Sequence, residues 1–93
     1  MSKLDDARNI INNVDLEMIE LFKKRMNAAK MVAEYKSEFN MPIFDESREK
    51  EIIEKNKNNL NDKELEKYYL EWFNTMLKVS KDYQKDLIGD KNA

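Results

Sequence analysis

The sequence predicts an all-α protein of three helices, the first of them very long. Two observations carry this prediction. Apolar residues recur at alternating steps of three and four, which is the spacing of one face of a helix, over most of the chain. The 93 residues also contain only one glycine and one proline, the residue types that most often end helices, and both lie near predicted helix ends.

The first predicted helix covers residues 4–39. Its main apolar stripe extends over five heptads and is interrupted once, by Arg25. A second line of apolar residues widens this face, as a helix with several neighbours requires. Pro42 follows the helix, because the residue before a proline is disfavoured in the helical region. The stripe consists of Leu4, Ala7, Ile11, Val14, Met18, Leu21, Ala28, Val32, Tyr35 and Phe39.

The second predicted helix covers residues 46–57, and Asp45 is its expected N-cap. The polar segment 58–61 is then expected to form a turn. The predicted inner face of this helix contains Arg48, Glu49, Ile52, Ile53 and Asn56.

The third predicted helix covers residues 62–88, with Asn61 or Asp62 as its N-cap and Gly89 as the residue that ends it. We interpret residues 1–93 as a single domain. The predicted buried face of the third helix contains Leu65, Tyr69, Trp72, Phe73, Met76, Ser80, Tyr83, Gln84 and Leu87.

The length of the first helix predicts a second copy of the chain. A helix over residues 4–39 is about 50 Å long, whereas a compact chain of this size has a radius of gyration of about 12–13 Å. Because the apolar stripe continues along the whole helix, we expect a second copy to cover it in a two-fold, intertwined homodimeric helical bundle.

Composition excludes several classes of function. The chain has no histidine and no cysteine, which excludes catalytic triads, thiol nucleophiles, disulfides and metal sites built on imidazole or thiolate. A single glycine excludes a glycine-rich phosphate loop. A net charge of −2 and the lack of an apolar signal core or membrane-length run predict a cytoplasmic protein with neither nucleic-acid nor membrane partners.

Two cations interrupt the apolar pattern of the first helix. Arg25 occupies a position of the main stripe, and Lys36, eleven residues later, lies within about 20° of the same line. Two long cationic side chains on one face can hold a small dianion between them. The alternatives are that Arg25 fixes the register of helix packing and that Lys36 extends to solvent from the end of the helix.

Polar residues also lie on the inner faces of the other two helices. Ser80 and Gln84 are one turn apart in an apolar and aromatic stripe, where buried polar groups need partners. Arg48 and Glu49 follow Asp45 at the start of the second helix. The alternatives are hydrogen bonds between helices for the first pair and a capped helix turn with local ion pairs for the other three.

Arg8 lies seventeen residues before Arg25 and about 100° around the helix, so it cannot join Arg25 and Lys36 of its own chain. In a crossed dimer, the amino end of one long helix can reach the middle of its partner. Arginine suits carboxylates because its planar fork binds both oxygens. These residues together predict a site for a small polyanion, most simply a dicarboxylate.

The pattern of these residues resembles that of the all-helical chorismate mutases of the AroQ class. The resemblance covers residues 4–87 and includes the run K-x5-P-I-x-D-x-x-R-E from Lys36 to Glu49. The residues that carry it are Arg8, Asp15, Arg25, Val32, Lys36, Pro42, Ile43, Asp45, Arg48, Glu49, Ser80 and Gln84.

The resemblance implies an intertwined homodimer with two active sites, each completed by one arginine of the other chain. It implies that chorismate rearranges to prephenate, a step of phenylalanine and tyrosine biosynthesis, without a cofactor or metal. Arg25 and Arg8 of the partner subunit would bind the substrate carboxylates. Lys36 and Gln84 would donate to the ether oxygen of the breaking bond.

For the remaining residues, the resemblance implies that Glu49 and the backbone at Asp45 hold the ring hydroxyl. Arg48 and Ser80 would line the site and assist at a carboxylate. Two other functions stay open at this point. One is an isochorismate pyruvate-lyase, which the same fold supports, and the other is a non-catalytic helical dimerisation module in which the inward charges only fix register.

Overall fold

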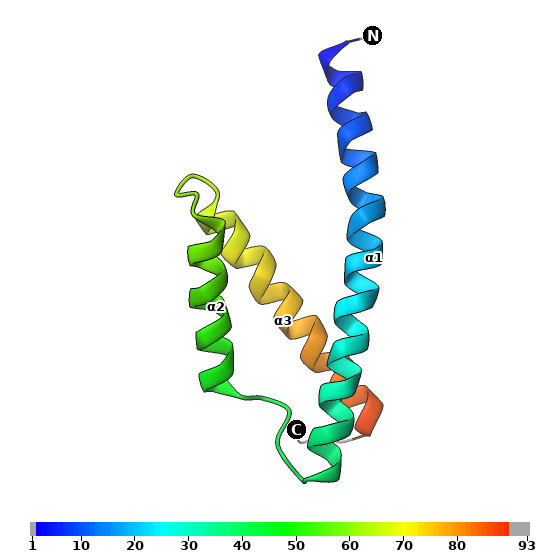
Figure 1. Cartoon of the computed structure of the whole chain (residues 1–93), viewed down its shortest axis with the longest axis vertical. Helices are drawn as coiled ribbons and strands as arrows, with labels where there is room; N and C mark the ends of the chain where they lie inside the picture. The colour runs from blue at the N-terminus through cyan, green and yellow to red at the C-terminus, as the bar shows by residue number, and fades with distance from the viewer. Residues whose placement is uncertain (1, 90–93) are drawn as a thin grey trace.

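The computed structural model describes residues 2–89, and this part of the chain contains three α-helices and no strands (Figure 1). They are α1 (Lys3–Glu38), α2 (Glu46–Leu60) and α3 (Glu66–Ile88). The all-α prediction is confirmed. Helix α3 packs against both α1 and α2, whereas α1 and α2 do not pack against each other within residues 2–89.

The molecule is elongated. Its longest extent is 56 Å, and its radius of gyration is 16.5 Å, compared with about 12 Å for a compact chain of this length. The reason is α1, which has 36 residues and is therefore about 54 Å long. Figure 1 shows that the amino-terminal half of α1 extends away from α2 and α3.

Polar side chains and a left-handed residue fix the two ends of α1. At its start, Ser2 Oγ accepts a hydrogen bond from the Asp5 N–H at 3.1 Å, and the Asp5 side chain accepts one from the Ser2 N–H. At its end, Asn40 adopts a φ of 53°, and the Met41 N–H donates to the Lys36 carbonyl at 2.7 Å. This is the arrangement of a Schellman motif. The helix therefore spans 3–38 rather than the predicted 4–39.

The predicted boundary between α2 and α3 was wrong. Residues 58–60 belong to α2, so this helix ends at Leu60 rather than at residue 57. Asn61 ends α2 in the left-handed conformation, with a φ of 46°, and does not begin the next helix. Asp62 does act as a cap, because its Oδ1 accepts the Leu65 N–H at 3.1 Å. It caps a separate turn, and α3 begins at Glu66 rather than at residue 62.

The core is small and lies where α3 crosses α1. Of the α1 residues, only Ala29 and Ala33 are buried, because their short side chains let α3 approach closely and the amino-terminal half of α1 extends away from the other two helices described within residues 2–89 (Figure 1). The apolar stripe of α1 is therefore mostly exposed in the single chain. The buried apolar residues are Ala29, Ala33, Ile43, Phe73 and Leu77.

The buried face of α3 is narrower than predicted. Phe73, Ser80 and Gln84 are buried as expected, and Leu77, which was not predicted, is buried with them. Three residues of the predicted face are only half-buried and three are exposed, since α1 crosses α3 over part of its length and α2 covers only one side of it. The half-buried residues are Tyr69, Met76 and Tyr83, and the exposed ones are Leu65, Trp72 and Leu87.

Asp45 is the N-cap of α2, as predicted. Its Oδ1 accepts hydrogen bonds from the Arg48 N–H and the Ser47 hydroxyl, each at 3.1 Å. The bond from the Arg48 backbone, followed by that from Ser47, lowers the pKa of the Asp45 carboxyl, and the charge of Lys36 lowers it further. The carboxylate is therefore held in its ionised form at the start of the helix, where the helix dipole also favours a negative charge.

The lowered pKa of Asp45 predicts a pH-dependent contribution to stability. A depressed folded-state pKa stabilises the fold above the unfolded value of about 3.9, and this contribution is lost as the pH falls through the folded-state value. We expect Asp45→Ala to lower the free energy of unfolding in urea at pH 7, and Asp45→Asn, which keeps a neutral cap, to cost less. The gap between the parent and Asp45→Ala should narrow at pH 3; an equal gap at both pH values would contradict the prediction.

Candidate functional site

Arg25 and Lys36 lie on the side of α1 that packs toward α3. They share this side with Ala29 and Ala33, at successive spacings of four, four and three residues. Both cationic side chains are half-buried, and their Cα atoms are separated by about 16 Å along the helix axis. The two positive charges therefore flank the crossing of α1 and α3.

Ser80 and Gln84 are the buried polar residues of α3. They continue the stripe of Phe73 and Leu77, and only 6% and 7% of their surfaces are exposed. Gln84 Nε2 donates to Ser80 Oγ at 3.2 Å. Gln84 Oε1 is buried and has no hydrogen-bond partner among the described residues. A buried amide oxygen without a partner is costly in a stable fold, which makes Gln84 a candidate to bind a ligand.

Lys36 also fixes the connection between α1 and α2. Its Nζ donates to the Ile43 carbonyl at 2.9 Å, and Ile43 is itself buried. The effect of the Lys36 charge on the pKa of Asp45 places this ammonium near the start of α2 as well. Lys36 therefore joins the end of α1 to the connection, close to the first turn of α2.

Glu49 is paired with a lysine that the sequence analysis missed. Lys81 Nζ lies 3.0 Å from Glu49 Oε2, and their side chains are 25% and 22% exposed. The same Nζ lies 4.7 Å from the centre of the Phe44 ring. We call Phe44, Glu49 and Lys81 the Lys81 cluster. The sequence did not single out Lys81, because Leu77, one turn before it, was not predicted to be buried and lysine is the usual surface cation of this chain.

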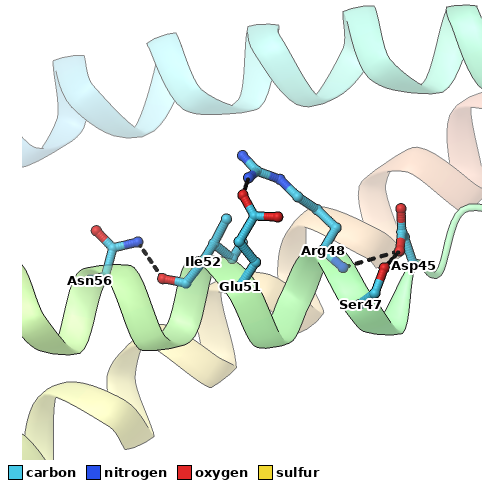
Figure 2. A network of polar contacts seen from close by, with 6 residues as sticks. All are labelled: Asp45, Ser47, Arg48, Glu51, Ile52 and Asn56. Carbon is cyan, nitrogen blue, oxygen red and sulfur yellow. Dashed lines mark hydrogen bonds and ion pairs between the residues drawn. The ribbon is translucent and has the colours of Figure 1, made fainter.

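Apart from the bond between the Arg48 N–H and Asp45, the structure brings neither Arg48 nor Arg8 into contact with the other predicted site residues. Figure 2 shows the Arg48 guanidinium on the side of α2 that faces α1 in this view, where it pairs with Glu51 at 2.9 Å. Both side chains of that pair are more than half exposed. Arg8 is exposed and lies about 26 Å along α1 from Arg25, beyond the reach of any side chain.

Arg25 borders an open groove of about 600 Å³ between α1 and α3. Apart from Asp15, Lys23, Arg25 and Thr75, its lining is apolar or aromatic, including Phe22 and Trp72, which are each 52% exposed. A second hollow of about 540 Å³, at the carboxyl ends of α1 and α3, contains none of the predicted site residues.

The arrangement provides fixed positive charge and N–H donors. Lys36 has three donors, of which the Ile43 carbonyl takes one, and Arg25 has five in a planar fork. Between residues 2 and 89, no group of three or more acidic side chains is arranged to hold a metal ion. Each helix in this stretch is too short or too polar to span a bilayer. Chemically, the site suits an anionic ligand and the stabilisation of negative charge on oxygen.

Comparison with known proteins agrees with this chemistry. The chorismate mutase type II family matches residues 7–85. A bifunctional chorismate mutase/prephenate dehydratase of Aquifex aeolicus (strain VF5) is 40% identical over 55 residues, which cover 59% of this chain and 15% of that protein. A protein with the same description from Buchnera aphidicola subsp. Schizaphis graminum (strain Sg) is 36% identical over 87 residues, covering 88% of this chain and 22% of that protein.

The chain thus spans about a fifth or less of the length of these curated relatives. No solved structure gives a significant match. The family match extends over all three helices and includes every predicted site residue from Arg8 to Gln84. On this basis, the chain belongs to the chorismate mutase type II family.

Proposed function

We propose that this protein is a chorismate mutase, which converts chorismate to prephenate in the biosynthesis of phenylalanine and tyrosine. The observation that carries the proposal is the family match over residues 7–85, within which half-buried cations and a buried amide lie on the packed sides of α1 and α3. As the sequence predicts, we also propose that the enzyme is cytoplasmic.

The chemistry explains why a chain without histidine or cysteine suffices. The reaction is an intramolecular [3,3] rearrangement in which a C–O bond breaks as a C–C bond forms, and it needs no nucleophile, proton transfer, metal or cofactor. The enzyme helps by holding the enolpyruvyl arm over the ring, which removes the entropy cost of reaching the reactive conformer. It also places positive charge where the ether oxygen becomes negative.

Lys36 and Gln84 are the proposed donors to the ether oxygen. Lys36 is supported by its contact with the Ile43 carbonyl, which fixes the ammonium while leaving two of its three N–H groups free to donate. Gln84 is supported by its unpartnered oxygen. Rotating its amide by 180° keeps the contact with Ser80, whose hydroxyl then donates, and turns the NH₂ group toward the unpartnered side.

The other residues have proposed roles in substrate binding. Arg25 binds one carboxylate, and the Arg48 guanidinium assists at a carboxylate together with Ser80. The Arg48–Glu51 pair is exposed and contributes little to stability, so a substrate carboxylate can replace Glu51 at small cost. Glu49 and the backbone at Asp45 hold the ring hydroxyl.

The proposed active enzyme is an intertwined homodimer in which Arg8 of the partner subunit completes each site. Two observations support it. The amino-terminal half of α1 exposes large apolar side chains that are not covered within residues 2–89, such as Ile10 at 64% and Leu16 at 65%. In addition, Arg8 is too far along α1 to reach Arg25 of its own chain.

The first prediction concerns turnover. Purified protein should consume chorismate, which is measured as the loss of chorismate absorbance, and should yield prephenate. Lys36→Ala should lower kcat by about 10²–10³-fold with a smaller change in KM, because the contact of Lys36 with the ether oxygen strengthens in the transition state. Lys30→Ala, which removes an exposed lysine of α1, is the matched control.

Near-normal kcat in Lys36→Ala would contradict the role of that residue. If a folded parent left chorismate unchanged, the mutase proposal itself would be wrong. Formation of salicylate and pyruvate from isochorismate by that parent would then identify a lyase.

The second prediction concerns the amide of Gln84. In Gln84→Glu, the new carboxyl can donate to the ether oxygen only when it is protonated. The variant should therefore be active at acidic pH and lose activity as the pH rises, while the parent changes little over the same range. A kcat profile parallel to that of the parent would show that position 84 does not donate in the transition state.

The third prediction concerns the shared site. Arg8→Ala and Lys36→Ala are each expected to have very low activity. When equal amounts are unfolded and refolded together, half of the dimers are mixed, and one of their two sites carries neither substitution. The mixture should then recover about a quarter of parent activity. Activity no higher than the mean of the two variants refolded alone would show that each site forms within one chain.

A further inference from the structure

The Lys81 cluster joins three separate parts of the chain. Lys81 lies on α3, Glu49 in the first turn of α2, and Phe44 in the connection that precedes α2. Lys81 Nζ approaches both carboxylate oxygens of Glu49, at 3.0 Å from Oε2 and 3.3 Å from Oε1. Most ion pairs of the described chain join residues three or four apart on exposed helix faces, whereas this one joins residues 32 apart.

The geometry of the cluster restricts where the Glu49 carboxylate can go. The Phe44 ring lies 4.7 Å from Lys81 Nζ, a distance at which the ring face attracts an ammonium. The ammonium thus contacts both an aromatic ring and a carboxylate. Both charged side chains are about three-quarters buried, so solvent screens their attraction less than it does at an exposed pair.

The proposed substrate gives this pair a specific purpose. Chorismate carries two carboxylates, and an ionised Glu49 beside it adds a third negative charge. Like charges a few ångströms apart repel each other, and the repulsion is stronger where water is partly excluded. A cation bonded to Glu49 cancels most of this repulsion and leaves lone pairs of the carboxylate free to accept the ring hydroxyl.

We propose that Lys81 is a positioning residue of the active site, which orients Glu49 toward the ring hydroxyl and neutralises its charge against the dianionic substrate. Lys81 itself does not touch the substrate. This inference rests on the proposed function, because Glu49 can bind the ring hydroxyl only if the protein acts on chorismate.

The test is a double-mutant cycle measured as kcat and KM for chorismate. Lys81→Met keeps most of the length of the side chain and removes its charge, and Glu49→Gln removes the charge that Lys81 neutralises. Lys81→Arg restores a cation. The matched control is Lys78→Met, which removes a lysine from the same helix whose partner, Asp82, belongs to an exposed pair. Circular dichroism and unfolding midpoints establish that each variant is folded.

We expect Lys81→Met to lower kcat/KM by about tenfold, with a raised KM as the larger part of the effect, because repulsion weakens substrate binding. In the Glu49→Gln background, the same substitution should change kcat/KM by less than about twofold, since no carboxylate remains to neutralise. Lys81→Arg should recover most of the loss, and Lys78→Met should match the parent. Should Lys81→Met not fold, Lys81→Gln takes its place in the cycle.

Other outcomes overturn the inference in distinguishable ways. An equal loss in both backgrounds would mean that Lys81 acts on the substrate directly rather than through Glu49. Parent-like kinetics in Lys81→Met would mean that the pair has no part in the reaction. If the parent itself does not convert chorismate, the proposed function fails first, and the role of Lys81 fails with it.

Discussion

The close packing of α3 against two alanines of α1 is the contact on which the rest of this structure depends. Ala29 and Ala33 are the only residues of α1 that are buried within the described chain, and α2 packs against α3 alone. Small side chains at a helix crossing let the two helices approach closely. Arg25 and Lys36 lie on either side of these alanines, while Gln84 is buried on the facing helix. The contact that forms the fold therefore also brings the elements of the proposed site together.

The connection between α1 and α2 owes its position to two lysines on different helices. Lys36 of α1 binds the carbonyl of Ile43, and Lys81 of α3 lies over the ring of the next residue, Phe44. Lys81 then continues to Glu49 in the first turn of α2. Because α1 and α2 do not pack on each other within residues 2–89, these polar contacts and the packing of both helices on α3 hold the start of α2 relative to α1. A site built from both helices needs such a link, since small displacements of binding groups are costly in rate.

The sequence predicted the helices well and their ends less well, for a physical reason. The interior of a helix follows from the spacing of apolar residues, which a single sequence shows. The Asp45 cap was also predictable, because it depends on hydrogen bonds between residues close in the sequence. Asparagine is ambiguous, because it can cap a helix, continue it or adopt the left-handed conformation. Asn40 and Asn61 adopt the left-handed conformation. Asn58 and Asn59, which were expected to form a turn, instead continue α2.

For the site, spacing along one helix identified the inward polar residues, such as the buried Ser80 and Gln84. It could not identify the partner of Glu49, because Lys81 is 32 residues away and meets it only once α2 folds back along α3. In the proposed dimer, the partner subunit buries the groove beside Arg25 and brings its Arg8 toward Arg25. The apolar burial then has to overcome the repulsion between these two positive charges. A dianionic substrate bound between these cations removes that repulsion. Substrate binding and dimer formation are then linked by mass action, so each strengthens the other.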